Sequence, residues 1–564
     1  MRDSAPTVAL RRQHISIILS LVIGVTVGLV TVAFILLTGR LAARMYPAGG
    51  AAWRRLVLPA AGSLISGILL YKYFPDARGS GIPQTKFAIF INDGYISLRT
   101  AMGKFLCCGI SLASGIALGR EGPSVHIGAG IASVLSRRFE LDKQTVKDMI
   151  PVGCSAALAA AFNTPIAAVL FSLEEVLGDL HAPVLGSVVI SSATSWIVLH
   201  MVLGDEPLFH VPAYQLVHPA EFGIYALLGI VGGLGSVCFV KLLLNIRKWF
   251  ARLPKSTVWA QPVVGGLLVG VLGWFMPEVL GVGYDYVERV LGGDFTVKTV
   301  ALLAMLKIVA TAVCYSSGNA GGIFGPSLFI GAMIGGATGA VAHHFLPGIT
   351  ANAGAYALVG MGTAFAGIVR TPLTSVIMIF EMTRDYSIIV PLMISNLVSF
   401  FVSRLFQPIP IYEALALQEG VLLPSGEGKG ELSSLRISAV MRTDCELFTP
   451  DLDVQGALSR LKESGRNAWP VGESRNVDGL VTSRQLEEVG NRELCLREVL
   501  LSAEQYPYVH ADQSLAAALE EMGRAGADAL PVVSRANIHE LHGVVTLPQV
   551  MEAYGLARGL PGSS

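Results

Sequence analysis

Charged side chains are scarce in this chain of 564 residues, where Asp, Glu, Lys and Arg together make up only 15% of the composition. Hydrophobic residues account for 52%, and the mean hydropathy is +0.58. A soluble domain of this length needs more charge to cover its surface. The composition therefore excludes a soluble globular protein and indicates a protein that lies in a lipid bilayer.

Other features are missing as well. The 41 basic and 41 acidic residues cancel, so no charge excess favours a nucleic-acid partner. The seven cysteines form no CxxC or Cys/His spacing, and the eleven histidines are scattered without an HExxH or a Ser/His/Asp pattern. We therefore predict no enzyme, no metal and no cofactor. Five cysteines in apolar segments are predicted to be small buried thiols: Cys107, Cys108, Cys154, Cys238 and Cys314.

Acidic residues are nearly absent from two long apolar regions. Residues 94–139 contain a single acid, Glu121, and residues 295–380 contain none. A cation pathway is lined by carboxylates or ordered carbonyl groups, so this interior favours anions and argues against a divalent-cation transporter. An ionisable residue inside a membrane segment with no acidic neighbour is functional by default, although an acid in the first turn of a helix also simply complements the helix dipole.

Long uncharged runs indicate the membrane helices. The runs are 15–37, 222–244, 262–276, 299–313 and 388–401. Several are short or interrupted by Gly and Pro, so we expect tilted and broken helices. Arg2, Arg11 and Arg12 precede the first run, which favours a cytoplasmic amino terminus. No small-residue cleavage site follows the run, which argues against a removed signal peptide.

One phrase occurs twice: GPSVHIGA at 122–129 and GPSLFIGA at 325–332. Gly-Pro predicts a proline at the first helical position, with free backbone N–H groups around Gly122 and Gly325 available to an anion. A second pair of phrases, each running from a Gly through Thr-Pro to a Glu, matches 153–174 to 360–381. Offsets of 203 and 207 residues place both pairs in one register, which predicts two related halves with a site where they meet.

The composition changes after residue 406, and a polar stretch at 424–434 predicts a linker into a charged tail. The tail contains two successive patterns typical of a β-α-β-β-α unit. We predict an all-α polytopic membrane protein with two inverted repeats of tilted, interrupted helices, followed by a cytoplasmic α+β pair. The predicted segments are 1–14 (cytoplasmic), 15–418 (membrane domain, with halves 15–205 and 220–405), 419–436 (linker), 437–490 and 495–556 (tail domains) and 557–564 (flexible end).

Three short motifs carry a family resemblance. GSGIP at 79–83, GREGP at 119–123 and GIFGP at 322–326 occur in this order within the duplicated region, and together they resemble the signature loops of the CLC family of chloride channels and proton-coupled chloride transporters. The tail is similar to a tandem pair of CBS domains, which also occurs in that family. The resemblance implies a homodimer with one pathway in each subunit, a bacterial inner-membrane location and cytoplasmic termini.

The resemblance also implies functional residues. The implied chloride ligands are Ser80, Gly81, Ile82, Ile323, Phe324 and Tyr412, and Glu121 would be the gate, whose carboxylate leaves an anion position when it takes a proton. Without the family resemblance, these residue types also allow other roles. Ser80 is also suited to a turn, Tyr412 to a membrane interface, and Lys104 and Arg120 either to anion steering or to snorkelling.

Glu174 and Glu175 follow an apolar run, and the resemblance places Glu175 at the internal proton-accepting glutamate of the exchangers. Two interpretations compete for this pair: a proton port, or interfacial carboxylates at a helix end. The first favours chloride–proton exchange, and the alternative function is a passive chloride channel on the same scaffold.

The tail offers three candidate nucleotide contacts, Thr449, Thr482 and Thr546. Nucleotide-binding CBS motifs place an Asp after the Thr, whereas this chain has Gln485 and Gln549 there. A small ligand at the tail therefore remains one hypothesis, with adenine nucleotide the less favoured choice, and a dimerising or stabilising role is the other. Gln84 replaces the Glu that many relatives carry directly after GSGIP.

Overall fold

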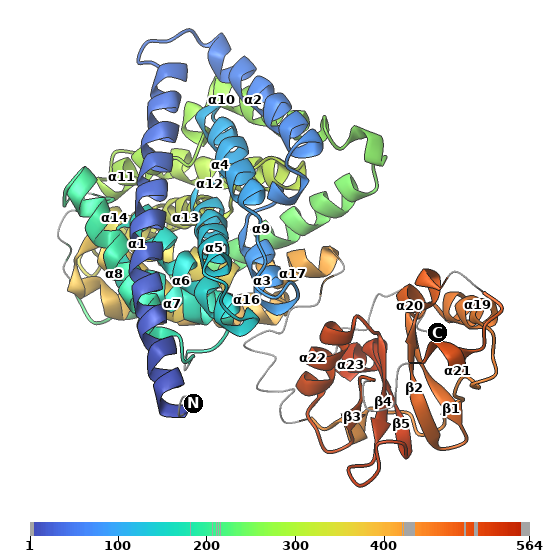
Figure 1. The fold of residues 1–564 in the computed structure, drawn as a ribbon. Helices are drawn as coiled ribbons and strands as arrows, with labels where there is room; N and C mark the ends of the chain where they lie inside the picture. The colour runs from blue at the N-terminus through green and yellow to red at the C-terminus, as the bar shows by residue number, and fades with distance from the viewer. Residues whose placement is uncertain are drawn as a thin grey trace. The chain divides into compact units, whose positions relative to one another are not determined.

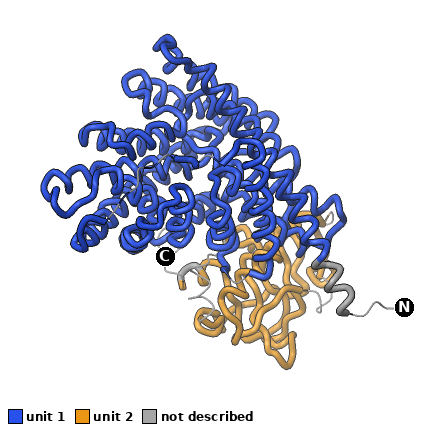
Figure 2. The backbone as a smooth tube through the Cα atoms, turned by 90° about the vertical axis from the view of Figure 1, so that its left-hand side faces the viewer, with its two compact units in different colours: residues 1–423 blue, residues 424–564 orange. Residues whose placement is uncertain are grey.

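The computed structural model describes residues 5–180, 182–205, 207–209, 211, 214, 216–419, 421, 435–489, 492–500 and 506–553. The chain divides into two compact units, residues 1–423 and residues 424–564 (Figure 2). The predicted linker stretch at 424–434 and the predicted flexible end at 557–564 lie outside the described residues.

The named elements of the first unit are all helices where the structure describes it. Those of its first half are α1 (Ala5–Met45), α2 (Trp53–Lys72), α3 (Ile82–Phe90), α4 (Leu98–Ala113), α5 (Glu121–Arg138), α6 (Lys143–Phe162), α7 (Pro165–Phe171), η2 (Ser172–Leu177) and α8 (Leu185–Leu203). Those of its second half are α9 (Glu221–Ala251), α10 (Gln261–Phe275), α11 (Tyr284–Leu291), α12 (Val297–Ser316), α13 (Phe324–Phe345), α14 (Ala353–Val369), α15 (Pro372–Thr383), α16 (Ile389–Phe406) and α17 (Ile411–Gln418). Short 3-10 turns occur at Pro75–Ala77, Lys255–Thr257, Pro277–Val279 and Tyr386–Ile388.

The two halves follow the same order. Helices α1 to α8 correspond to α9 to α16 one by one, with α7 and η2 together matching α15 (Figure 1). The pairing of neighbours repeats too: α1 packs on α8 as α9 does on α16, and α5 packs on α6 as α13 does on α14. Helix α17, which carries Tyr412, has no counterpart among the described residues after α8. The predicted duplication is confirmed, and a chain of this design can place equivalent loops from both halves around one centre.

Eight helices among the described residues are long and apolar enough to cross a membrane. Each of the five predicted apolar runs coincides with one helix, namely α1, α9, α10, α12 or α16. Helices α3, α7, α11 and α15 are much shorter than a bilayer is thick, in agreement with the prediction of interrupted helices. Irregular backbone is therefore present inside the unit, where protein groups rather than lipid must satisfy it.

Glycines of the repeated phrases allow the central helices to touch. A Cβ atom on Gly128 would lie 2.3 Å from the carbonyl oxygen of Gly153, where α5 crosses α6. In the second half, a Cβ on Gly331 would lie 2.2 Å from the carbonyl oxygen of Gly360, where α13 crosses α14. The repeated Gly of the phrase is thus a helix-crossing residue, and its duplication reflects one packing arrangement used twice.

The prediction for the cysteines needs one correction. Cys107, Cys108, Cys154 and Cys314 are buried free thiols as predicted, whereas Cys238 is exposed on α9. A run that is apolar all round does not reveal which face of the helix meets lipid, so the sequence could not separate this residue from the others.

The second unit contains the two predicted β-α-β-β-α patterns. Its elements are η6 (Ile437–Ala439), α19 (Val454–Ser464), β1 (Ala468–Glu473), β2 (Asn476–Thr482), α20 (Ser483–Glu488), α21 (Leu496–Val499), β3 (Val509–His510), α22 (Leu515–Ala525), β4 (Ala529–Val533), β5 (Leu541–Thr546) and α23 (Leu547–Ala553). Strands β1 and β2 pair antiparallel, and the second sheet has the order β3-β4-β5. Phe448 bridges Val471 in parallel, as Val509 of β3 pairs with Val532 of β4. The unit is thus itself a duplication.

Candidate functional site

The two halves of the first unit meet at a pair of glycines. The N–H of Gly119 donates to the carbonyl of Gly322 at 2.7 Å, and the N–H of Gly322 donates back to Gly119 at 2.7 Å. This antiparallel bridge brings together the loops that lead into α5 and α13. The amino termini of these two helices therefore converge on the junction, as the repeated phrase predicted.

The helices begin earlier than predicted. Helix α5 starts at Glu121 and α13 at Phe324, so Pro123 and Pro326 occupy the third helical position instead of the first. Proline is tolerated throughout the first turn because the N–H that it lacks has no acceptor within the helix there. The correction matters because it puts Glu121 and Phe324 inside the first turn rather than before it.

Glu121 is fully buried, and its carboxylate lies against the opposite repeat. Oε2 accepts a hydrogen bond from the N–H of Gly325 at 3.2 Å, in the first turn of α13. Oε1 accepts one from the hydroxyl of Tyr284 at 2.5 Å. The carboxylate therefore lies at the positively polarised end of a helix from the other half, which is a position suited to an anion.

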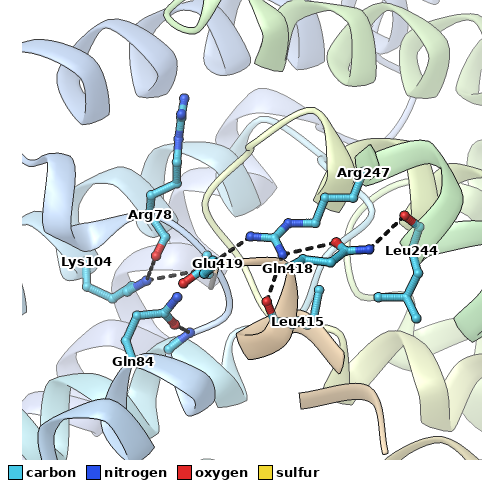
Figure 3. A network of polar contacts seen from close by, with 10 residues as sticks. Arg78, Gln84, Lys104, Leu244, Arg247, Leu415, Gln418 and Glu419 are labelled. Atoms are coloured by element: carbon cyan, nitrogen blue, oxygen red, sulfur yellow. Dashed lines mark hydrogen bonds and ion pairs between the residues drawn. The ribbon is translucent and has the colours of Figure 1, made fainter. Parts of the chain in front are cut away.

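The loop that carries Ser80 packs against the start of α5. Gly81 has φ of 103°, and a Cβ there would lie 2.6 Å from the carbonyl oxygen of Gly122. The ammonium of Lys104 donates to the carbonyls of Arg78 and Gly79 at 3.2 and 2.9 Å (Figure 3). Lys104 is completely buried and braces this loop, so its ammonium does not snorkel to a membrane interface, and anion steering stays a prediction.

Gln84, the departure from the family motif, stabilises the same loop. Its Oε1 accepts a hydrogen bond from the N–H of Gly81 at 2.9 Å, at the start of α3. An amide oxygen performs this capping role without adding a negative charge near Ser80. The substitution therefore preserves the fold of the loop and makes its surroundings less acidic.

Two buried hydroxyls at the predicted chloride ligands have no partner in good hydrogen-bond geometry among the described residues, although the Tyr315 hydroxyl lies beside that of Ser80. They are Ser80 Oγ, in a side chain that is 0% exposed, and Tyr412 Oη, in a side chain that is 1% exposed. A buried hydroxyl is usually hydrogen-bonded, so each of these two has a donor proton available for a further partner. Both are donors that an anion would accept, so the donor set fits chloride.

Ile323 and Phe324 are completely buried at the start of α13. The ring of Phe324 packs against the rings of Phe162 at 4.8 Å, Phe171 at 5.5 Å and Phe365 at 4.3 Å between centroids. This aromatic cluster fixes the first turn of α13, whose backbone N–H groups have no acceptor within the helix. The backbone at Ile323 and Phe324 is thus held in place by apolar packing.

Glu175 is 7% exposed and lies in the π-helical turn η2. Its Oε1 is 2.8 Å from the ammonium of Lys86, which is 5% exposed and belongs to α3. A π-helical turn inserts one extra residue into a helix and is common at functional sites. The turn lets neighbouring glutamates face different elements.

Glu174 faces the other repeat. Its carboxylate accepts hydrogen bonds from the N–H of Thr374 at 2.9 Å, from the Thr374 hydroxyl at 2.7 Å and from the N–H of Leu373 at 3.4 Å. These groups belong to the first turn of α15. Glu174 is therefore a helix cap, and of the two adjacent glutamates only Glu175 stays a candidate for proton transfer.

Tyr284 lies outside the signature motifs and was not predicted, although the sequence contains a signal for it. Residues 277–284 read PEVLGVGY and match PDARGSGI at 75–82, so the turn Gly281–Gly283 repeats Gly79–Gly81. Lys307 lies 203 residues after Lys104, is completely buried and donates to the carbonyls of Val279 and Gly281 at 3.0 and 2.6 Å. The equivalent lysines, Lys104 and Lys307, were thus a sequence signal that the turn before Tyr284 repeats the Ser80 loop.

A cavity of about 930 Å³ lies beside the Ser80 loop. Gly79, Gln84, His126 and Tyr315 line it on the side of this loop. Several basic side chains also line it: Arg78, Arg99, Arg247 and Lys255. Two acidic residues, Asp76 and Glu419, line the cavity too, so basic groups outnumber acidic ones and the net charge favours anions beside the Ser80 loop.

Arg247 connects this cavity with the end of α17 (Figure 3). Its guanidinium donates to Glu419 at 2.6 Å and to the carbonyl of Leu415 at 3.1 Å. The side chain of Gln418 donates to the carbonyl of Leu244 on α9 at 3.0 Å. These bonds fasten to α9 the helix whose first turn contains Tyr412.

The tail residues predicted as nucleotide contacts are differently engaged. The hydroxyl of Thr482 donates to Oε1 of Gln485 at 3.0 Å, and that of Thr546 donates to Oε1 of Gln549 at 2.9 Å. Each Thr–Gln pair therefore forms part of the cap at the start of a helix, α20 for Thr482 and α23 for Thr546. Thr449 is exposed. The cap geometry gives no support to a ribose site at these threonines, and a ligand at the tail remains a prediction.

The site and fold define a membrane transport protein with two structurally related halves and anion-attracting helix ends at their junction. The family model described as "Voltage gated chloride channel" matches residues 62–404, and the CBS domain model matches residues 496–555. The first match covers more than half of the chain. The chain therefore belongs to the CLC family of voltage-gated chloride channels.

Individual relatives extend the comparison. The H(+)/Cl(−) exchange transporter ClcA of Vibrio campbellii is 33% identical over 365 residues, which cover 62% of this chain and 78% of that protein. A putative chloride channel protein, ClcB-like, of Ralstonia nicotianae is 34% identical over 61% of this chain and 81% of that protein. A eukaryotic CLC transporter structure matches with a TM-score of 0.69 at 21% identity, covering 96% of this chain and 98% of that one, which shows that the fold is shared.

Proposed function

We propose that this protein exchanges chloride for protons across a membrane and that Glu121 is the gate. The observation that carries the proposal is the position of the Glu121 carboxylate, which receives the N–H of Gly325 at the start of a helix from the opposite repeat. An ionised carboxylate is a tethered anion in a place suited to chloride. Once protonated it loses that attraction and leaves the position to chloride.

Chloride would be held by the groups that the resemblance names. The buried hydroxyls of Ser80 and Tyr412 would donate to it, together with the backbone N–H groups of Ile323 and Phe324. The turns at Gly81 and Ile82 and the helix starts at Gly122 and Gly325 would shape the pathway. Dipoles at helix ends attract a halide without presenting a full opposite charge, so chloride can also leave.

Protons would reach Glu121 by way of Glu175. Glu175 is buried against Lys86, and the neighbouring Glu174 is occupied as a cap of α15. The name of the Vibrio relative supports exchange, whereas the name of the Ralstonia relative supports the alternative, a passive chloride channel on the same scaffold. The burial of Glu175 favours exchange, because a passive channel needs no internal proton acceptor.

The adjacent glutamates provide a matched test in liposomes containing the purified protein. In Glu175→Gln, we expect proton movement to be lost while chloride flux continues. In Glu174→Gln, one residue away, both fluxes should continue because this side chain only caps a helix. Loss of proton movement in both variants, or in neither, would contradict the assignment of Glu175.

The assembly and orientation are further proposals. The family resemblance supports a homodimer in a bacterial inner membrane, and Arg2, Arg11 and Arg12, which precede the first long apolar run, support a cytoplasmic amino terminus. Chemical cross-linking in the membrane should give a dimer, and a cysteine placed at the amino terminus should resist a membrane-impermeant thiol reagent in intact cells.

A further inference from the structure

Tyr284 lies where the second repeat reproduces the Ser80 loop. It is the first residue of α11 and follows Gly283, whose φ is 87°. A Cβ on Gly283 would lie 2.7 Å from the ring of Phe329, so the turn requires glycine there. The corresponding residue of the first repeat is Ile82, which has no polar group. Only the second repeat therefore presents a hydroxyl at this position.

The hydroxyl of Tyr284 is held in a fixed place. The Lys307 ammonium donates to the carbonyls of Val279 and Gly281 just before the turn, and the ring of Phe209 packs edge-on against the Tyr284 ring with centroids 5.5 Å apart. A brace on the backbone and a contact on the ring leave the phenol little freedom. The donor is thus preorganised toward its acceptor, which is Oε1 of Glu121 at 2.5 Å.

The two oxygens of Glu121 have different donors. Oε2 takes the backbone N–H of Gly325, a group that also suits a chloride ion, whereas Oε1 takes the phenol of Tyr284. The Nε atom of Arg120 is 3.9 Å from Oε1, beyond hydrogen-bond distance. A hydrogen bond to an ionised carboxylate is about twice as strong as one between neutral groups. The phenol therefore holds the charged gate firmly and releases the protonated one more readily.

We propose that Tyr284 is a positioning residue for the gate, whose hydroxyl latches the Glu121 carboxylate at the start of α13 and limits how often chloride takes its place. This inference rests on the proposed function of Glu121. It adds a residue outside the three signature motifs, and it gives the gate a second donor that does not come from the α13 backbone.

The test compares Tyr284→Phe in two backgrounds by chloride and proton flux from liposomes. In the otherwise unchanged protein, loss of a hydrogen bond to a charged group should raise chloride flux roughly tenfold. Fewer protons should move per chloride, because the gate leaves its position without being protonated. In Glu121→Ala, which has no carboxylate to latch, Tyr284→Phe should change nothing. Tyr286→Phe, on the same helix, is the matched control and should behave like the unchanged protein.

The outcomes separate two failures. If Glu121→Ala alters flux and coupling but Tyr284→Phe does not, the latch is wrong and the gate stands. An equal rise in flux in both backgrounds would also contradict the latch, because the ring would then act through packing. If Glu121→Ala itself leaves flux and coupling unchanged, the proposed function fails, and the inference fails with it.

Discussion

Glu174 and Glu381 occupy equivalent places in the two repeats, and each caps a helix of the opposite repeat. Glu174 accepts hydrogen bonds from the first turn of α15, and Glu381 accepts them from the N–H groups of Ile166 and Ala167 in α7 at 2.9 and 2.7 Å. The repeats are therefore joined by exchanged carboxylates as well as by the glycine bridge. This reciprocity follows from a twofold relation between the halves.

Glu381→Gln should lower stability by about 1–2 kcal/mol, because the neutral amide is a weaker acceptor at a helix start and lacks the favourable interaction with the helix dipole. Glu174→Gln should lower it by a similar amount. Thermal denaturation in detergent would measure both, with Glu140→Gln, an exposed glutamate, as the control. A large loss in one variant and none in the other would contradict the reciprocal arrangement.

Lys86 and Glu175 form a buried ion pair whose partners depend on each other. Lys86→Met should destabilise the protein by roughly 3–5 kcal/mol, because a buried charge then loses its counter-ion. The double variant Lys86→Met with Glu175→Gln should recover much of this loss, since neither charge remains.

Denaturation of the wild type, both single variants and the double variant completes a thermodynamic cycle for the pair. A coupling near zero would mean that the contact contributes little, and Lys86 would then have no part in holding Glu175.

The crossing of α13 over α14 leaves no room for a methyl group at Gly331, whereas nothing lies within 4 Å of a Cβ placed on Gly186 in α8. Gly331→Ala should therefore cost roughly 1–3 kcal/mol through overpacking. Gly186→Ala should be neutral or slightly stabilising, because alanine favours helix. The melting temperatures of the two variants test this, and equal values would show that the helices separate easily.

The repeated phrases predicted much of this arrangement. The GPS phrases located the converging helix ends, and the Thr-Pro to Glu phrases fixed the register of the halves. They could not show that Glu174 and Glu381 cross to the opposite repeat, because a cap within one repeat requires the same residue types. Nor could they separate Glu174 from Glu175, since the π-helical turn that directs them to different partners leaves no mark in composition.

Tyr284 was harder to predict for a different reason. Its turn shares only two glycines with the Ser80 loop, and such short matches occur by chance. Lys104 and Lys307 would have supported the match, but a lysine in an apolar run is usually interpreted as snorkelling. That both ammonium groups bind loop carbonyls depends on tertiary contacts that the local sequence does not encode.

The surface contacts of Asp205 with Arg384 and His200 predict how stability depends on pH. Hydrogen bonds from Arg384 and His200 lower the pKa of Asp205, just after α8, to about 2. The folded-state pKa is thus below the unfolded value of about 4, so the stabilisation is present above pH 4 and is lost as the pH falls toward 2. The melting temperature should be higher than that of Asp205→Asn at pH 6, and the difference should shrink below pH 4. A difference that persists at low pH would contradict the ionic origin.

The most direct test of the central claim, that a proton on the Glu121 carboxylate opens the chloride position, is paired flux from liposomes with an outward chloride gradient and no initial pH gradient. The account predicts that chloride leaving through the wild-type protein drives protons inward, and that Glu121→Gln still passes chloride while moving no protons. Chloride flux through the wild type without any proton movement would contradict the account and establish a passive channel instead.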